Sequence, residues 1–499
     1  MKILQKIGSL FSGAKSFTRS IRNSYDGGES NRLTADWNVS TNSADVEINR
    51  DYKTVSARAL DLDRNNSWVS RYKSLLNNNV LGANGVGLQM KVKDANGQLD
   101  TLACRAIKDA WEDWKKRENC DIAGKHCWRE KEGLFLDRTA IEGNAMIRFH
   151  RGAQFKYGFT TETVEFSRLD FSYSANLASG NRIRFGVESD KYGKVIAFHL
   201  FTTTPTDMFG GPQLQRERVD AKDIVHGFVA DRPEQTIGMP WIVNVMRPLR
   251  DLGKYREAEL VAARQEACKG YAIKPAMPTD YIGDSEDEEP LEEMSPGMGM
   301  MLKPGEDLIQ INPTHPNTAF GEFTKSALRE IASALNVGYM SLANDPSDAN
   351  YSSMRGSKLE EIEEYKVIQG WLIESLHDRT FSAWLEMALS SAAVKMSNGS
   401  PLPLAKFDKF NAPDWKPRRW PWVDPKSDLD AAILSVEKGF KSRSEIIAEM
   451  GGDIANVFSE QESDNELAKL HKLSFPLGTN PQGQITNSSN EQSSTTKTV

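Results

Sequence analysis

PWIVNVMRPLRDLGKYREAELVAARQEACK, residues 240–269, is the stretch that decides the fold. A continuous helix over these 30 residues would be about 45 Å long. Pro248 is expected either to kink this helix or to begin its main segment. Small residues leave one side of it open to close packing: Ala258, Ala262, Ala263 and Ala267. Charges of both signs cover the rest, so the helix cannot be the core of a compact domain and must project or line something.

The chain before this helix mixes helices with strands. Residues 55–80 and 102–118 carry aromatic and aliphatic residues at helical spacing, and a glycine-rich turn follows the first of them. Between residues 140 and 230 four short apolar runs predict strands: AMIRFH, RIRFGVE, VIAFHLF and DIVHGFV. Asp190, Tyr192 and Gly193 lie between two of these runs and predict a hairpin turn.

The chain after the long helix is mainly helical. A clean apolar stripe predicts a helix over 317–336, with Asn317 as its N-cap. A long polar loop and a further helix to about residue 394 come next. A segment rich in Pro and Trp then leads to a short helical unit at 427–450, and the polar tail 477–499 is expected to be disordered. The fold class is therefore α+β.

Chain length and net charge limit the classes of protein to which this sequence can belong. At 499 residues the chain is expected to form two to four domains. Its net charge of −7 argues against a protein that coats nucleic acid, but suits one past which DNA slides. The first 23 residues are basic and amphipathic, so they could touch anionic lipid or DNA, or form a terminal helix or a mobile arm. No stretch approaches the roughly 20 apolar residues of a membrane span.

Motifs for catalysis are missing. The sequence has no phosphate-binding loop, no nucleophile elbow and no zinc-protease motif. Cys120, His126 and Cys127 form only half of a zinc pattern, which favours free thiols. The acidic run 284–293 lacks the ligand spacing of a calcium loop and is most simply a solvated surface, although carboxylates can bind Mg²⁺. We therefore predict no catalytic residues, no metal site and no cofactor.

Four segments, in order along the chain, resemble the lambda-type portal family of tailed bacteriophages. They are RALDLDRNNSW at 58–68, DRPEQTIGMPW at 231–241 with the helix that follows it, PGEDLIQINPTHPNTAFGEF at 304–323 with LREIASALNVGYMSLANDPSDANYSSMR at 328–355, and DWKPRRWPWVDPKSDLDA at 414–431. The likeness covers about residues 55–473. One departure is Gly338-Tyr339, where many relatives have a proline.

The resemblance implies a portal-type, ring-forming fold with a helical stem, a mixed α/β wing and clip, and a helical C-terminal region. Mapped onto this chain, the parts are an arm at 1–54, the wing at 55–239, a first stem helix at 240–269, the clip at 270–316, a second stem helix at 317–336, a channel loop at 337–353, a wing helix at 354–394, a crown-side region at 395–476 and the tail at 477–499.

The resemblance also implies the sites. The clip would dock the packaging motor through its acidic residues: Glu286, Asp287, Glu288, Glu289, Glu292 and Glu293. The channel loop would face DNA with short polar side chains and one tyrosine: Asn344, Asn350, Tyr351, Ser352 and Ser353.

The expected partners are eleven further copies in a ring of twelve, the terminase large subunit, the major capsid and scaffolding proteins, head-completion or connector proteins, and double-stranded DNA that passes without sequence specificity. The expected location is the portal vertex of the virion, after assembly in the host cytoplasm. Two other classes remain open from the residues alone: a nucleic-acid hydrolase, which needs a metal-binding carboxylate cluster, and a capsid or scaffolding component, which forms shells or rods.

Overall fold

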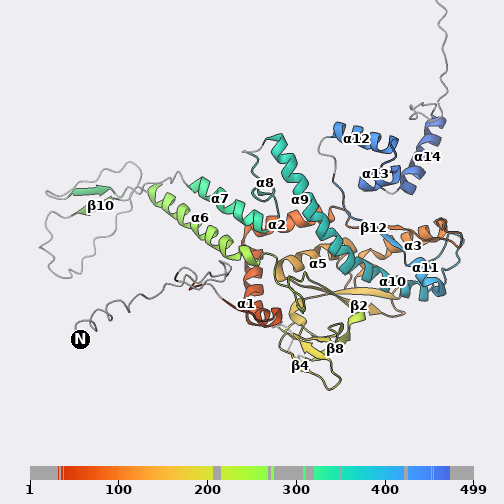
Figure 1. Cartoon of the computed structure of the whole chain (residues 1–499), viewed down its shortest axis with the longest axis horizontal. Coiled ribbons are helices and arrows are strands. Elements are labelled where there is room, and N and C mark those ends of the chain that lie inside the picture. Colours follow the sequence, from red (N-terminus) through yellow and green to blue (C-terminus); the bar gives the residue numbers. More distant parts are fainter. Residues whose placement is uncertain are drawn as a thin grey trace, which may run out of the picture.

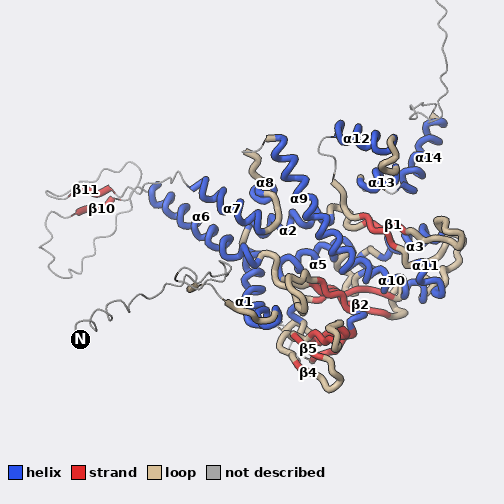
Figure 2. Tube along the Cα trace, viewed as in Figure 1, coloured by secondary structure: helices blue, strands red, loops and turns tan. Residues whose placement is uncertain are grey.

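The computed structural model describes residues 39–205, 215–267, 271–274, 307–310, 320–347, 350–420, 425–450 and 454–471, together with Arg32, Ala35, Asp36 and Gly452. The strands of the two larger antiparallel sheets follow one another between residues 145 and 227, and helices precede and follow them (Figure 1, Figure 2), which is the α+β pattern. Within those ranges no helix combines the length and the apolar character that a membrane span needs.

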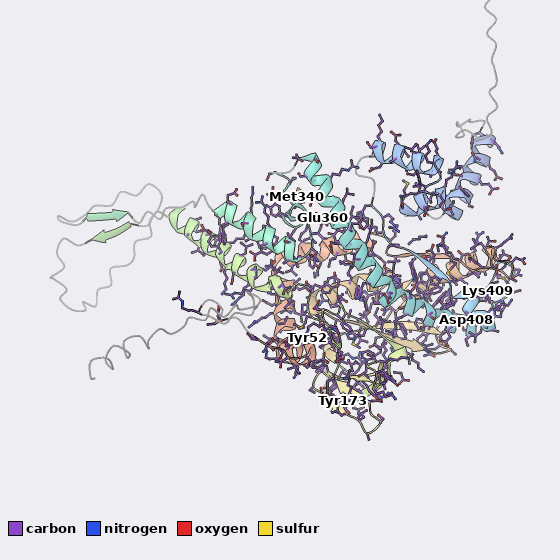
Figure 3. The ribbon with its side chains drawn as sticks, in the orientation of Figure 1. Tyr52, Tyr173, Met340, Glu360, Asp408 and Lys409 are labelled. Carbon is purple, nitrogen blue, oxygen red and sulfur yellow. The ribbon has the colours of Figure 1, made fainter. Side chains whose placement is uncertain are left out.

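Helix α1 (Ala44–Asn65) corrects the boundary of the N-terminal arm, which we expected to reach residue 54. Ala44, Ile48 and Tyr52 are buried, and their spacing of four residues puts them on one side of the helix. The Tyr52 hydroxyl donates to the backbone carbonyl of Glu142 at 3.0 Å. Figure 3 shows Tyr52 at the base of this helix. The segment 44–54 is therefore part of the body, although most of its residues are polar.

The helix expected over 55–80 is divided in two by Asn66. The backbone of Asn66 is extended, and its side chain accepts hydrogen bonds from the backbone amides of Trp68 and Val69. It thus ends α1 and caps α2 (Ser67–Leu76), a role for which asparagine is well suited. Helix α2 runs into a π-helical turn, Asn77–Leu81.

The four apolar runs form strands, as predicted. Strand β2 (Ala145–Arg151) is the centre of a three-stranded antiparallel sheet between β3 (Phe159–Val164) and β9 (Ile224–Gly227), with Met146 opposite Val164. A second, five-stranded sheet has the order β4 (Ala175–Asn176), β5 (Arg182–Arg184), β6 (Val187–Ser189), β7 (Val195–Phe201) and β8 (Arg216–Asp220).

The turn between β6 and β7 is also confirmed. The Asp190 carboxylate accepts hydrogen bonds from the backbone amides of Tyr192 and Lys194, at 2.8 and 2.9 Å. Gly193 has φ of 87°, a left-handed conformation that glycine adopts without steric cost.

A cluster of tryptophans holds the body together. Trp111 and Trp114 of α3 (Thr101–Trp114), Trp128 of α5 (Trp128–Glu142) and Trp384 of α10 (Asp378–Ser390) are almost completely buried. The rings of Trp111 and Trp384 meet edge to face with centroids 5.0 Å apart. Three of these tryptophans precede residue 240 in the sequence and one follows residue 350. The segments before and after the 240–350 region therefore pack together into one body.

The C-terminal part returns along the body. The single helix expected over 354–394 is α9 (Tyr351–Leu372), a π-helical turn (Ile373–His377) and α10. Strand β12 (Pro413–Lys416) then pairs antiparallel with β1 (Gly87–Met90). Outside the 240–350 region the other described α-helices are α4 (Arg117–Cys120), α11 (Phe407–Phe410), α12 (Pro425–Glu437), α13 (Arg443–Glu449) and α14 (Ile454–Leu470). The tail 477–499 lies outside the described residues.

Candidate functional site

Two helices, α6 (Met246–Ala267) and α7 (Phe320–Ala334), project side by side from one flank of the body (Figure 1). Pro248 lies in the first turn of α6, directly after a 3₁₀ turn (Val243–Val245), so it begins the helix rather than kinking it. Leu249 and Leu252 are buried at the root of α6. From Gly253 to Arg264 every described side chain is half-buried or exposed, as expected for a projecting helix.

Aromatic contacts join the two helices beyond their root. The ring centroid of Tyr255 lies 5.1 Å from that of Phe323 and 5.6 Å from that of Phe320. The Arg256 guanidinium lies 4.9 Å from the centre of the Trp68 ring of α2. Each contact of this kind is worth about 0.5–1.5 kcal/mol, so the pair is held together without a deep core.

Helix α7 has two distinct faces. Leu328, Ile331 and Leu335 are buried against the body. The opposite side carries exposed residues spaced by three or four: Glu322, Ser326, Arg329, Glu330 and Ser333. This polar side holds two acids, one base and two hydroxyls. Its exposed residues therefore do not form a continuous row of positive charges.

The connection from α7 to α9 is compact rather than open. After Asn336, whose φ is 53°, the chain forms the short helix α8 (Tyr339–Ala343). The Tyr339 hydroxyl donates to Asp345 at 3.0 Å, and the Ser347 hydroxyl donates to the same carboxylate at 2.6 Å. These hydrogen bonds, led by that of Ser347, hold the pKa of Asp345 below its usual range.

Glu361 of α9 anchors this connection. Its carboxylate is almost completely buried and accepts hydrogen bonds from Ser341 at 2.9 Å, from Tyr365 at 2.8 Å and from the backbone amide of Gly338 at 3.4 Å. Lys358 supplies the opposite charge at 3.1 Å. Figure 3 shows the same end of the molecule, with Met340 on α8 and Glu360 on α9. The connection is therefore fixed to α9 through one carboxylate.

The sequence offered little sign of Glu361. It lies in EEIEEY, residues 360–365, a run of acids that reads as a solvated helix face. The one hint is Tyr365, four residues later and hence on the same side of the helix. Gly338 has φ of −64°, a value that proline also adopts, but its backbone amide donates to Glu361, which a proline could not do.

The residues expected to face DNA have structural roles in the connection. Asn344 ends α8 in a left-handed conformation, with φ of 54°. Asn350 caps α9, because its side chain accepts a hydrogen bond from the backbone amide of Ser353 at 2.8 Å. In return, the Ser353 hydroxyl accepts a hydrogen bond from the backbone amide of Asn350 at 3.2 Å. Helix α9 begins at Tyr351, so Tyr351, Ser352 and Ser353 form its first turn and the loop boundary at 353 is corrected. Asn344, Asn350, Ser352 and Ser353 are exposed.

The expected motor-docking residues lie outside the described residues: Glu286, Asp287, Glu288, Glu289, Glu292 and Glu293. On either side of them the structure describes a two-stranded antiparallel ribbon, β10 (Tyr271–Lys274) with β11 (Asp307–Gln310), in which Tyr271 pairs with Gln310. The ribbon brings the two ends of the 275–306 segment together beyond the helix pair.

Acidic and sulfur groups elsewhere do not form a metal site in the part of the chain that the structure describes, where no three His, Cys, Asp or Glu side chains gather suitably. Cys104, Cys120 and Cys127 are free thiols. The Cys120 thiol donates to the backbone carbonyls of Lys115 and His126. Burial raises the pKa of this thiol to about 12, so it is inert rather than nucleophilic.

One buried pair of titratable groups stands out in the tryptophan core. The Glu132 carboxylate lies 3.5 Å from Nε2 of His377, and both side chains are essentially inaccessible to solvent. Burial raises the pKa of Glu132 to about 8 and lowers that of His377 to about 3. Near neutral pH the core therefore holds a protonated acid beside a neutral imidazole, both shielded from solvent.

Comparisons of the sequence with known proteins identify the family. The family model for phage portal proteins of the lambda family matches residues 30–369. A probable portal protein of Halomonas phage phiHAP-1 is 31% identical over 91% of this chain and 87% of its own length. Portal protein B of Escherichia phage lambda is 20% identical over 85% of this chain and 86% of its own.

Solved structures give a weaker likeness. The neck of a native GTA particle, computed with C12 symmetry, contains a chain that is 15% identical, with a TM-score of 0.43 over 81% of this chain and 94% of that one. On the family model and the Halomonas phage relative, this chain belongs to the lambda family of phage portal proteins.

Proposed function

We propose that this chain assembles into a closed ring of twelve copies at one vertex of the capsid, around a channel through which double-stranded DNA is packaged and later ejected. The observation that carries the proposal is the projecting pair α6–α7, with the polar side of α7 turned away from the body. Twelve such sides around an axis would form a channel wall of serines and mixed charges.

The chemistry of that wall suits passage rather than binding. Each lysine or arginine that contacts a phosphate releases a counterion and stabilises the complex. Beside its single arginine, the polar side of α7 carries Glu322 and Glu330, so the wall does not add up to a basic stripe. The net charge of −7 for the whole chain has the same consequence.

The segment beyond the ribbon β10–β11 is proposed to dock the packaging motor. Residues 284–293 hold seven acids in ten positions, and such a patch attracts a basic partner over a distance and in a salt-dependent manner. The terminase large subunit is the proposed partner during packaging, and head-completion or connector proteins afterwards. The body is proposed to contact the major capsid and scaffolding proteins, first in the host cytoplasm and then in the virion.

The protein is proposed to be structural and to have no ATPase or nuclease activity of its own. Negative-stain microscopy and mass photometry of the purified full-length chain test the proposal together with an ATP hydrolysis assay. We expect rings with a central hole, the mass of twelve 55.8 kDa chains and no turnover of ATP. Shells, rods or a monomer at all concentrations would contradict the ring. ATP hydrolysis abolished by a single substitution would contradict the structural role.

A further inference from the structure

A cavity of about 430 Å³ lies where the end of α7 meets α2 and α9. Among the side chains that line it, Tyr72, Leu76 and Tyr365 are buried. Half-buried Trp241 and Trp371 extend the wall, and their ring centroids are 5.9 Å apart. Small-molecule sites in proteins have volumes of about 300–1,000 Å³ and mainly apolar and aromatic linings. The cavity therefore has the size and the lining of such a site.

A second cavity, of about 320 Å³, adjoins the first and is acidic. Both are lined by Asn336, Val337 and Glu364, so they lie next to each other. Glu360 and Glu361 line the second cavity alone. Among the described residues that line the two there is no lysine, arginine or histidine. We call the two together the amphipathic cavity, because one part is apolar and aromatic and the charged side chains of the other are all acidic.

Negative charge in the amphipathic cavity is only partly matched. The Glu361 carboxylate has Lys358 at 3.1 Å. No ion pair joins Glu360 or Glu364 to a base in the part of the chain that the structure describes. These two acids are four residues apart on α9, a spacing at which like charges repel. The C-terminal end of α7, which reaches the cavity at Ala334, adds the partial negative charge of its carbonyl groups. A positively charged occupant would match all three sources.

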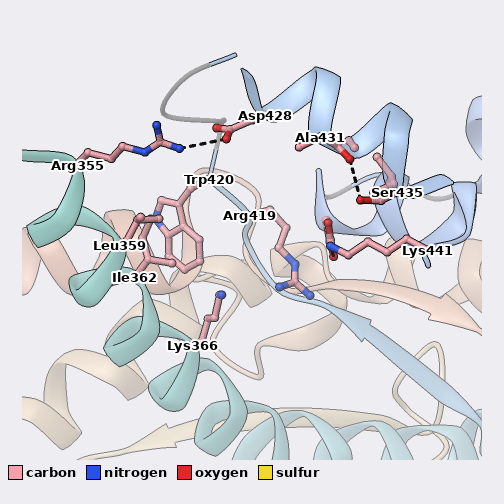
Figure 4. Close-up of a pocket in the computed structure, with 13 residues that line it drawn as sticks. Arg355, Leu359, Ile362, Lys366, Arg419, Trp420, Asp428, Ala431, Ser435 and Lys441 are labelled. Carbon is pink, nitrogen blue, oxygen red and sulfur yellow. Dashed lines mark hydrogen bonds and ion pairs between the residues drawn. The ribbon is translucent and has the colours of Figure 1, made fainter. Parts of the chain in front are cut away.

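Two other bases of α9 lie on the opposite side of the helix. Figure 4 shows Arg355 and Lys366 along the cleft between α9 and α12. Arg355 pairs there with Asp428 at 3.3 Å. At 100° per residue, these two bases are about half a turn away from Glu360 and Glu364. Helix α9 thus separates its charges, and these bases do not neutralise the amphipathic cavity.

We propose that the amphipathic cavity binds an aliphatic polyamine. Its ammonium groups lie at Glu360 and Glu364, and its methylene segments lie against the rings of Trp241 and Trp371. Residues four apart in a helix are separated by about 6 Å along its axis, a separation that two ammonium groups joined by a few methylenes can match. Aromatic rings also attract ammonium groups. The inference goes beyond the proposed function and does not depend on the ring.

Simpler occupants match only part of this lining. A bare metal cation would satisfy the two acids but would leave the apolar part without a partner, and no three described His, Cys, Asp or Glu side chains gather suitably for a metal. A neutral apolar molecule would fill the aromatic part but would leave both carboxylates unmatched. A polyamine alternates charged and apolar groups along one chain, as the cavity does along its wall.

Hydrogen exchange of the full-length chain, with spermidine as the probe, tests the site. A polyamine that contacts both α7 and α9 stabilises the folded form of this junction by mass action. At an excess of about tenfold over its dissociation constant, we expect the amides of residues 333–338 and 364–371 to exchange about tenfold more slowly. Magnesium chloride at the same ionic strength and a neutral diol of similar length should each leave exchange there almost unchanged.

Two substitutions test the two parts of the cavity separately. Glu364→Gln keeps the shape of the side chain but removes its charge, and should raise the spermidine concentration at half-maximal protection by about tenfold. Ala334→Trp places a large ring in the apolar part from an exposed position and should abolish the protection. Glu363→Gln is the matched control and should behave as the wild type, because Glu363 is exposed, pairs with Lys366 and does not line the cavity.

Melting temperatures without spermidine show whether each variant folds, and Glu364→Gln, a change at an exposed position, keeps the test decisive if Ala334→Trp does not fold. Equal protection by magnesium would overturn the inference, because the acids alone would then be sufficient. Equal protection by the diol would reduce the site to an apolar pocket and would overturn it as well. Protection that survives both substitutions, or its absence in the wild type, would have the same consequence. The proposed function is measured by ring mass and would stand in each case.

Discussion

The hydroxyl of Ser341 donates to the carboxylate of Glu361 at 2.9 Å and so ties helix α8 to helix α9 across 20 residues of chain. The backbone of the same serine is held from the other side, because Nε of Arg71 donates to its carbonyl oxygen at 2.9 Å. The connection that follows α7 is thus clamped between α2 and α9. Such a clamp keeps the connection in one conformation, whatever surface it faces.

Replacing Glu361 should loosen that connection. Glu361→Ala leaves Ser341, Tyr365 and Lys358 without their shared partner, and each buried group left unsatisfied costs about 1–3 kcal/mol. We expect the free energy of unfolding to fall by about 2–4 kcal/mol and the amides of residues 338–343 to exchange faster. Glu360→Ala, one position away and exposed, is the control and should change neither quantity. Equal behaviour of the two variants would show that the carboxylate does not anchor the loop.

Substitutions at Asn350 can separate a helix cap from a DNA contact. Asn350→Ala removes the cap of α9 and should cost about 1 kcal/mol of stability. Asn350→Ser keeps a capping oxygen but changes the group presented to solvent. If the loop faces DNA, both variants should impair genome retention, measured as the length of DNA protected from nuclease. If only the alanine variant is impaired, the defect comes from the lost cap.

Tyr255 should determine the order of the projecting helix pair. Tyr255→Ser removes the ring that contacts Phe320 and Phe323, each contact worth about 0.5–1.5 kcal/mol. We expect faster amide exchange in α6 beyond Lys254 and no change in the melting temperature of the body. Tyr192→Ser, at a turn where the ring is 82% exposed, is the matched control. A lower melting temperature for Tyr255→Ser would place this tyrosine in the cooperative core instead.

Stability should fall as the pH rises from neutral toward 8 because of Glu132. Its pKa is raised by burial to about 8, from 4.5 in an unfolded chain, so the folded state keeps a proton that the unfolded state has already lost. That contribution is complete below pH 4.5 and is lost as the pH rises through 8. Between pH 6.5 and 8 we expect a loss of about 2 kcal/mol. Chemical denaturation of Glu132→Gln over this range should show a much flatter dependence, and parallel curves would rule Glu132 out.

Charge reversal in the acidic run should weaken motor docking without affecting the ring. Glu288→Lys combined with Glu289→Lys removes two of the seven acids and adds two bases. We expect less packaging at physiological salt, with the defect of the variant smaller at high salt, where the wild-type attraction is also screened. Ring mass by mass photometry is the internal control. Normal packaging by the double variant would make the run a solubilising loop.

Much of the fold could be read from periodicity. The four apolar runs became strands, and the turn at Asp190 formed as its residues require, because these signals are local to a few neighbouring residues. The helices expected at 102–118 and 317–336 correspond to α3 (Thr101–Trp114) and α7 (Phe320–Ala334) for the same reason, while the expected N-cap Asn317 lies outside the described residues. Asn66 and the π-helical turn at Ile373–His377 divided two helices that the sequence alone presented as continuous, because the apolar spacing carries on across both interruptions.

The sequence by itself determined the family, the strands and the long polar helix that leaves the body, since each depends on residue order and spacing alone. Only the tertiary structure decided which polar residues are buried. Glu361 lies in a run of acids that looks solvated, yet it joins α8 to α9. Asn350 looked free to meet DNA, and it is exposed, but it also caps α9 through Ser353, a contact local to three residues. The partners of Glu361 at Gly338 and Ser341 lie 20 or more residues away along the chain, and only the fold brings them within hydrogen-bonding distance.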